Sequence, residues 1–280
     1  MQTINYITGE ETTVRASFWK SEVNVKKPTI FYIHGGGLIY GNRNDLPGPY
    51  VKLLLESGYS LFSIDYCLAP ECSYSAIIQS VNDGLKFFLM NSKKIGLFNN
   101  DYILFGRSAG AYLCLQLMTE NLSKKPMAFI DFYGFESLLS ANLQRKNSMY
   151  ASYPKVTFAE AQSMISTSPV TSSSVEERFL LYVYARQSNQ WQKIIFKDTQ
   201  SKEKQLSKST LQSFPPTYMC QSSYDPNVPF INSIMLKAKL PNSKLIPINS
   251  KEHDFDREVN ETNLDCYRKL ISWLDAVTEH

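Results

Sequence analysis

The hydrophobic positions of the chain follow two alternating patterns. Short apolar runs, typical of strands buried on both faces of a sheet, alternate with segments whose apolar residues recur about every 3.6 positions, as on one helix face. The expected strands are Ile4–Thr8, Val14–Trp19, Thr29–His34, Ser60–Tyr66, Tyr102–Gly106, Met127–Tyr133, Thr217–Gln221 and Lys244–Asn249, the first two forming an antiparallel hairpin. The expected helices are Pro49–Ser57, Tyr74–Asn91, Ala109–Asn121, Pro229–Leu240 and Asn263–Val277. This order predicts a single α/β domain over residues 1–280, with a mostly parallel eight-stranded sheet flanked by helices.

One interval, residues 135–213, lacks a convincing core strand and is far longer than an ordinary connection. It follows a central strand, at the edge of the sheet where the site is expected. We therefore expect a helical cap inserted over the site. A helical addition that only packs on the side of the sheet is the simpler alternative.

Composition and charge exclude several classes of protein. Hydrophobic residues make up 43% of the chain and charged residues 20%, which is ordinary for a soluble globular protein. A formal net charge of +3 is too small to indicate nucleic acid or an anionic membrane as partner. No apolar run reaches the ~20 residues that span a bilayer, and no secretory signal is visible. The five widely spaced cysteines and three histidines show no metal-ligand spacing, and a cytoplasmic location is expected.

A candidate nucleophile lies in Gly106–Gly110, whose sequence Gly-Arg-Ser-Ala-Gly fits the G-x-S-x-G pattern. That pattern forms a sharp strand-to-helix turn which exposes a serine hydroxyl, here Ser108. The apolar residues before and after it are typical of a strand and then a helix. A serine that only caps a helix in a glycine-rich turn is the alternative interpretation.

A serine nucleophile needs a base, and the chain has only His34, His253 and His280. His280 is the last residue, and His34 opens a glycine run whose turn it is expected to shape. Elimination leaves His253, which follows the last expected strand. There a loop can bring an imidazole onto the nucleophile in the chain order Ser, Asp, His.

The acid that orients the histidine is expected between serine and histidine in the chain, at the end of a strand. Asp225 follows the expected strand Thr217–Gln221 and fits this place. An aspartate that only begins the turn into Pro226 is the alternative. Asp254 and Asp256 are rivals, but a side chain so close to His253 in sequence would point poorly at its ring.

An oxyanion formed on the substrate needs N–H donors. The N–H of Ala109, directly after the nucleophile, is one candidate. The glycine run Gly35–Gly37 follows a strand, and its deepest members, Gly36 and Gly37, are the other candidates. The run matches neither the dinucleotide-binding nor the phosphate-binding glycine pattern.

These motifs, together with Asp65–Glu71 and Phe214–Thr217, make the chain resemble the hormone-sensitive-lipase-like branch of the α/β-hydrolase superfamily. The resemblance covers the chain from about residue 28 to its end, outside the insertion. Asp65–Glu71 carries six of the seven residues of the family pattern D-Y-R-L-A-P-E. The resemblance implies the α/β-hydrolase fold and a Ser-Asp-His carboxylic-ester hydrolase that uses no metal or organic cofactor and acts on short acyl chains.

The chain also departs from the family pattern. Cys67 stands in place of the arginine, which removes a charge that would pair near Glu71. Ala111 replaces a frequent glycine, and Asp254 stands where the glycine of a His-Gly-Phe sequence is usual. From the early position of His34 we expect no N-terminal cap helices of the usual kind, and we expect any cap to come mainly from residues 135–213.

The function expected from the sequence is therefore a serine esterase for small-molecule esters with short, acetyl-like acyl groups. A serine peptidase of the prolyl-oligopeptidase type has the same turn and triad order, but usually carries a large extra domain. A non-catalytic hydrolase-like receptor or scaffold is the third hypothesis, which a complete set of catalytic residues disfavours. A homodimer through the last strand or helix is compatible with this architecture.

Overall fold

A computed structural model describes residues 1–9, 11–144, 147–197 and 203–278. Eight strands form one sheet in the order β1-β2-β4-β3-β5-β6-β7-β8, and β2 is antiparallel to both of its neighbours. The pairs from β4 to β8 are all parallel, which confirms the predicted sheet. The strands are β1 (Gln2–Ile7), β2 (Thr13–Trp19), β3 (Thr29–Ile33), β4 (Leu61–Ile64), β5 (Tyr102–Arg107), β6 (Ala128–Phe132), β7 (Thr217–Ser222) and β8 (Ser243–Ile248).

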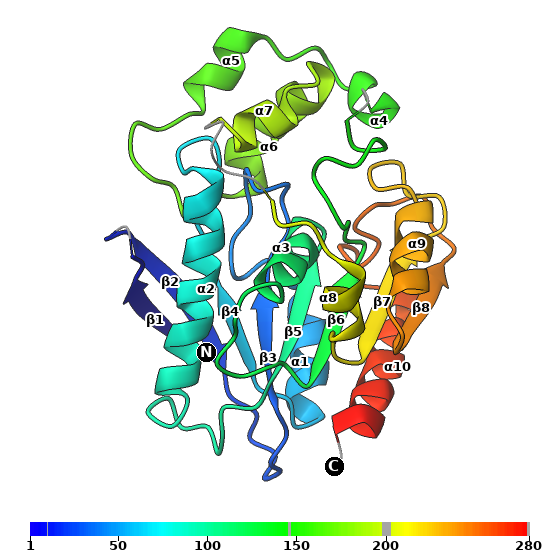
Figure 1. The fold of residues 1–280 in the computed structure, drawn as a ribbon. Helices are drawn as coiled ribbons and strands as arrows, with labels where there is room; N and C mark the ends of the chain where they lie inside the picture. Colours follow the sequence, from blue (N-terminus) through cyan, green and yellow to red (C-terminus); the bar gives the residue numbers. More distant parts are fainter. Residues whose placement is uncertain (10, 145–146, 198–202, 279–280) are drawn as a thin grey trace.

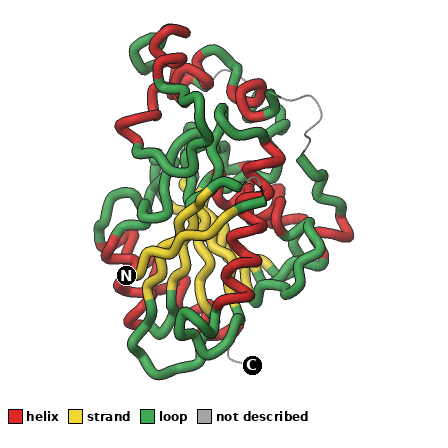
Figure 2. The backbone as a smooth tube through the Cα atoms, turned by 90° about the vertical axis from the view of Figure 1, so that its left-hand side faces the viewer, coloured by secondary structure: helices red, strands yellow, loops and turns green. Residues whose placement is uncertain are grey.

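Helices cover both faces of the sheet, as Figures 1 and 2 show. The helices are α1 (Gly48–Glu56), α2 (Tyr74–Asn91), α3 (Ala109–Leu117), α4 (Ser148–Ala151), α5 (Phe158–Ser163), α6 (Val175–Gln187), α7 (Trp191–Ile195), α8 (Lys208–Gln212), α9 (Ile231–Lys239) and α10 (Glu261–Thr278). Buried side chains of α1 and α10 form one apolar core with one face of the sheet, and those of α2, α3 and α9 join the core on the other. Burial of both faces explains the continuous apolar runs of the central strands.

The register of β3 and β5 places the two glycine-bearing motifs side by side. Ile33 is paired with Gly106, so both strands end at the same level of the sheet. His34 and the glycine run leave β3 there, and Ser108 follows β5 two residues after Gly106. The parallel arrangement thus brings two segments about seventy residues apart in sequence to one edge.

One helix ends earlier than its pattern predicts. The helix expected over Ala109–Asn121 stops at Leu117. The N–H of Thr119 donates to the Gln116 carbonyl oxygen, and the Thr119 hydroxyl donates to the same oxygen at 2.6 Å. A side chain that takes up a backbone acceptor competes with continued helical hydrogen bonding, which explains the early end.

Residues 135–213 contain α4 to α8 and, where described, no strand of the sheet. Figure 1 shows α4 to α7 beyond the edge where the motifs lie, whereas α8 lies lower, on the flank near β7 and α9. A two-residue bridge between Gly41 and Ser173 joins this interval to the loop after β3. The part of the interval that lies over the site is thus the segment carrying α4 to α7.

Two features are absent from the residues that the structure describes. No helix in them combines the length and the apolar character that a membrane crossing requires. Within the same residues, no group of three or more histidine, cysteine, aspartate or glutamate side chains has a geometry suited to a metal ion.

A buried carboxyl group on β6 makes the stability of this fold depend on pH. Asp131 is 1% exposed, its Oδ1 accepts the Gly134 N–H at 2.8 Å, and its Oδ2 has no hydrogen-bond partner among the residues that the structure describes. Burial raises the pKa of Asp131 from 3.8 to about 7, against the opposing effect of that hydrogen bond. The folded state therefore holds this proton more tightly than the unfolded state, so stability falls as pH rises from about 4 through 7.

We expect the stability of the Asp131→Asn variant, relative to that of the wild type, to increase as the pH rises. Between pH 5 and pH 9 the difference in unfolding free energy should shift by about 2–3 kcal/mol toward the variant, because an amide does not ionise. Urea unfolding at both pH values measures this shift. Asp265→Asn, on the half-exposed surface of α10, is the matched control. A pH-independent difference for Asp131→Asn would contradict the prediction.

Candidate active site

Ser108 lies in a sharp turn between β5 and α3. Its φ of 52° and ψ of −119° are unusual for a residue other than glycine, and such strain is typical of functional positions. The Ser108 N–H donates to the Phe132 carbonyl oxygen at 2.8 Å, which fixes the turn to β6. A Cβ atom on Gly110 would lie 2.1 Å from the Ile33 carbonyl oxygen, so only glycine lets α3 approach β3 this closely. The turn thereby presents the Ser108 hydroxyl at the edge of the sheet.

The structure brings Ser108, His253 and Asp225 together in one hydrogen-bonded chain. The Ser108 Oγ lies 2.8 Å from the His253 Nε2, and the His253 Nδ1 lies 2.7 Å from the Asp225 Oδ2. The N–H groups of Asn227 and Val228 donate to the Asp225 Oδ1 at 2.8 and 2.9 Å and hold the carboxylate in place. A nucleophile, a base and an orienting acid in this order can transfer an acyl group.

The charges of the pair change both pKa values in the direction that base catalysis needs. Burial of the His253 ring disfavours imidazolium, but the Asp225 charge and hydrogen bond outweigh burial and raise the pKa of His253 above 6.5. Burial would raise the pKa of Asp225, yet His253 and the Val228 and Asn227 N–H groups hold it below its usual range. Asp225 is thus ionised when His253 accepts a proton.

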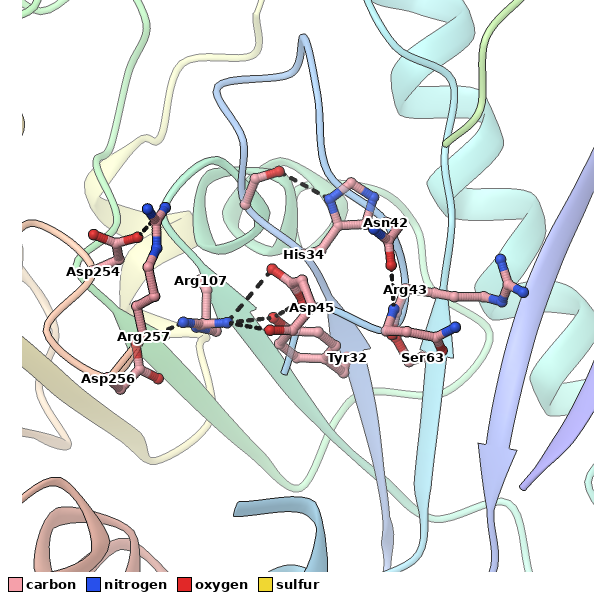
Figure 3. Close-up of polar contacts among 12 residues, drawn as sticks. Tyr32, His34, Asn42, Arg43, Asp45, Ser63, Arg107, Asp254, Asp256 and Arg257 are labelled. Carbon is pink, nitrogen blue, oxygen red and sulfur yellow. Dashed lines mark hydrogen bonds and ion pairs between the residues drawn. The ribbon is translucent and has the colours of Figure 1, made fainter. Parts of the chain in front are cut away.

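Both rival acids are engaged elsewhere. The Asp254 side chain forms an ion pair with Arg257. Asp256 is fully buried, and its Oδ1 lies 2.7 Å from the Arg107 Nη2 and accepts the Tyr133 hydroxyl at 2.6 Å. Figure 3 shows Asp254 turned toward Arg257 and Asp256 close to Arg107. Of the three candidate acids, all within the described residues, only Asp225 is hydrogen-bonded to the His253 ring.

Arg107 is a site residue that sequence reasoning did not single out. It is buried directly beneath the turn, and Figure 3 shows its guanidinium between Asp45 and Tyr32 on one side and Asp256 on the other. Its Nε donates to the Tyr133 hydroxyl at 2.6 Å. Arg107 directly precedes Ser108, and Asp256 follows His253 by three residues. The ion pair between Arg107 and Asp256 therefore joins the turn at Ser108 to the loop that carries His253. Arg107 occupies the variable second position of the G-x-S-x-G pattern, so the pattern gives no indication of its role.

The N–H groups expected to bind an oxyanion have no acceptor in the part of the chain that the structure describes. No hydrogen bond among the described residues uses the N–H of Gly36, Gly37 or Ala109. Gly36, Gly37 and Ser108 line one pocket. Unpaired N–H groups beside a nucleophile are what the stabilisation of a developing oxyanion requires.

His34 has the structural position that the sequence indicated. Its ring stacks on Tyr66 with centroids 4.2 Å apart, and its Nδ1 lies 2.9 Å from the Gly35 carbonyl oxygen. The ring is fully buried, and burial lowers the pKa of His34. The third histidine, His280, lies outside the described residues.

The pocket at Ser108 has a volume of about 540 Å³ and an aromatic wall. The rings of this wall form a closed circuit of contacts with centroids 5.3–6.1 Å apart. Tyr40 comes from the loop after β3, and the other four rings come from the 135–213 interval: Tyr150, Tyr153, Phe179 and Tyr182. The interval thus supplies most of the surface that faces a bound substrate on that side.

The charge missing at Cys67 is replaced from a distant part of the chain. The Arg178 Nη2 donates to the Glu71 carboxylate at 2.7 Å, and the same nitrogen donates to the Ala69 carbonyl oxygen at 3.0 Å. Both charged side chains are nearly fully buried, at 4% and 1% exposure. Arg178 belongs to α6, so the ion pair also holds the helices over the site against the sheet domain.

Two solved structures resemble this one over almost their full length. A protein of unknown function from Staphylococcus aureus subsp. aureus Mu50 is 30% identical, with a TM-score of 0.86 over 99% of this chain and 100% of that chain. An α/β hydrolase superfamily protein from Enterococcus faecalis is 26% identical, with a TM-score of 0.82 over 98% of this chain and 99% of that one. These similarities confirm the predicted α/β-hydrolase fold.

Curated relatives match over shorter regions. An acetyl esterase of Salmonella typhi is 33% identical over 88 residues, which cover 31% of this chain and 27% of that protein. The matched region spans 7% or less of the non-reducing polyketide synthases among the relatives. The BD-FAE family model matches residues 18–240. The chain therefore has the α/β-hydrolase fold and belongs to the BD-FAE family.

Proposed function

We propose that this protein is a carboxylic-ester hydrolase that works through an acyl-enzyme on Ser108. The observation that carries the proposal is the continuous hydrogen-bonded chain from the Ser108 Oγ through both ring nitrogens of His253 to Asp225. Family membership and the motif resemblance to hormone-sensitive-lipase-like carboxylesterases support the same reaction.

The first half of the reaction forms the acyl-enzyme. The Ser108 Oγ attacks the ester carbonyl carbon while the His253 Nε2 accepts the hydroxyl proton. The carbonyl electrons move to oxygen, and the N–H groups of Gly36, Gly37 and Ala109 stabilise that oxyanion. When the tetrahedral intermediate collapses, the alcohol leaves with the proton from His253, and the acyl group stays on Ser108.

The second half releases the acid. A water molecule gives its proton to His253 and attacks the acyl carbon, and the second tetrahedral intermediate expels the Ser108 oxygen, which recovers the proton. Asp225 keeps the imidazole oriented and stabilises its charged form in both halves. The base must be neutral to act, so activity should fall as the pH drops through the raised pKa of His253.

For the substrate we propose small esters with short acyl groups. A pocket of about 540 Å³ is of the size that holds a small molecule. The name of the Salmonella typhi relative, an acetyl esterase, agrees with this acyl size. Comparison of acetyl, butyryl and octanoyl esters of one leaving group tests it, and equal or faster turnover of the octanoyl ester would refute it.

Labelling with a fluorophosphonate tests the proposed reaction. We expect one adduct, located by peptide mass spectrometry on Ser108, together with the loss of ester hydrolysis in proportion to labelling. If the protein is a non-catalytic scaffold, neither labelling nor ester hydrolysis is expected. A peptidase of the prolyl-oligopeptidase type predicts labelling but efficient cleavage of peptide amides.

A further inference from the structure

The loop that would stabilise the oxyanion is held by a different partner at each of three successive carbonyl groups. The Gly35 carbonyl oxygen accepts the Tyr66 hydroxyl at 3.0 Å and also lies 2.9 Å from the His34 Nδ1. The Gly36 carbonyl oxygen accepts the N–H groups of Ile39 and Tyr40 at 3.0 and 3.1 Å. The third, on Gly37, accepts the indole Nε1–H of Trp191 at 2.9 Å.

These contacts determine where the loop N–H groups point. In a trans peptide the C=O and the N–H of one plane point in opposite directions. The plane that carries the Gly37 N–H is held through the Gly36 carbonyl, and the next plane is held through the Gly37 carbonyl by Trp191. The Cα atom of Gly37 joins these two peptide planes, and its φ is +61°. Hydrogen bonds that hold both planes therefore restrict rotation about the backbone bonds of Gly37.

Trp191 belongs to the 135–213 interval, whereas the other residues that donate to the loop carbonyl groups, Tyr66, Ile39 and Tyr40, lie outside it. It is the first residue of α7 in the interval over the site, and it is 2% exposed. The rings of Phe135 and Tyr182 pack edge-on against it at 5.8 Å, and the Arg186 guanidinium lies 4.7 Å from the ring centroid. An indole nitrogen can only donate, and burial removes water as an acceptor, so the Gly37 carbonyl is its required partner.

The loop also touches the interval directly. A Cβ atom on Gly37 would lie 2.4 Å from the Tyr182 ring of α6. The glycine therefore permits a contact between the loop and α6 that any side chain would block. Two helices of the interval, through Trp191 and Tyr182, thus form the outer support of the loop.

We propose that Trp191 is a positioning residue for the oxyanion-binding loop, so the helices over the site take part in transition-state stabilisation as well as in covering the pocket. The inference rests on the proposed esterase function. Trp191 touches neither the nucleophile nor the base and acts only through the Gly37 peptide. Its hydrogen bond should matter most when negative charge develops on the substrate oxygen.

Trp191→Phe removes the N–H donor and keeps an aromatic ring. We expect kcat for an acetyl ester to fall about tenfold, the effect of one typical hydrogen bond realised in the transition state, with KM within about twofold. Affinity for a boronic acid that forms a tetrahedral adduct on Ser108 should fall by a similar factor. Trp273→Phe is the matched control, because Trp273 packs on Tyr218 from α10, away from the site.

A second measurement uses the unmodified protein and does not depend on the variant folding. Of the indole ¹⁵N–H signals from the three tryptophans, that of Trp191 should shift when the boronic acid binds, while those of Trp19 and Trp273 stay in place. A kcat for Trp191→Phe within about twofold of wild type, a loss confined to KM, or a silent Trp191 signal would overturn the inference. Absence of Ser108 labelling in the wild type would overturn the proposed function and this inference together, whereas labelling with an unaffected Trp191→Phe variant overturns only the inference.

Discussion

Replacing Ser108 with alanine should lower kcat for ester hydrolysis by a factor on the order of 10⁵–10⁶. The alanine keeps the turn but has no oxygen to form the acyl-enzyme. The Oγ that His253 contacts at 2.8 Å is the only atom removed from the hydrogen-bonded chain. Initial rates with an acetyl ester of 4-nitrophenol measure the loss, and labelling by the fluorophosphonate should disappear with it.

Ser209→Ala serves as the matched control for this change. Ser209 is exposed on α8, on the flank of the sheet domain, so this variant should hydrolyse the same ester at the wild-type rate. Because α3 and the turn pack without the Ser108 hydroxyl, the Ser108→Ala variant should also unfold at close to the wild-type temperature. Activity that survives in Ser108→Ala above about 1% of wild type would exclude a serine mechanism at this position.

Asp225→Asn should lower kcat by a factor on the order of 10⁴. An asparagine in this place favours the wrong tautomer of the histidine ring and cannot stabilise its charged form. The Asp225 charge also offsets the effect of burial on His253. Without it the pKa of His253 should fall, so the acidic limb of the profile of kcat/KM against pH should move to lower pH. Measurements between pH 5 and pH 9 record both effects.

Asp254→Asn distinguishes the two candidate acids. Asp254 is one residue from His253 but pairs with Arg257 and is partly exposed, at 27% of its side chain. Loss of a partly exposed pair has a small effect, so kcat should change by less than about tenfold. The acidic limb should move to lower pH by less than in Asp225→Asn, because the Asp254 charge raises the pKa of His253 less than Asp225 does. If Asp254→Asn were the more damaging change, the assignment of Asp225 would be wrong.

Two of the contacts between residues 135–213 and the rest of the domain differ in their chemistry. The buried pair of Arg178 and Glu71 fixes the position of α6 and compensates for the missing family arginine. Trp191 fixes the glycine loop. The positive charge beside Glu71 thus comes from α6, whereas the D-Y-R-L-A-P-E pattern carries it within its own segment.

Local patterns were sufficient to predict the sheet, because burial on both faces leaves its signature in consecutive residues. The apolar runs identified each strand to within a residue or two, and the G-x-S-x-G pattern identified the strained turn at Ser108. The scarcity of histidines singled out His253 without any geometry. The early end of α3 at Leu117 was missed because apolar periodicity carries no signal of the tighter hydrogen bonds that Thr119 and Glu120 make to the last turn.

What the sequence by itself determined was therefore the succession along the chain of the strands and of the helices outside residues 135–213, the serine turn and the histidine that could serve it. Only the tertiary structure decided which aspartate contacts His253, that Asp256 pairs with Arg107, that Arg178 replaces a missing charge, and that Trp191 holds the glycine loop. These contacts join residues from 28 to 154 positions apart. The spacing of residues within a short segment cannot indicate such pairings. They arise only when the parallel sheet brings the ends of its strands, and the helices above them, to a common edge.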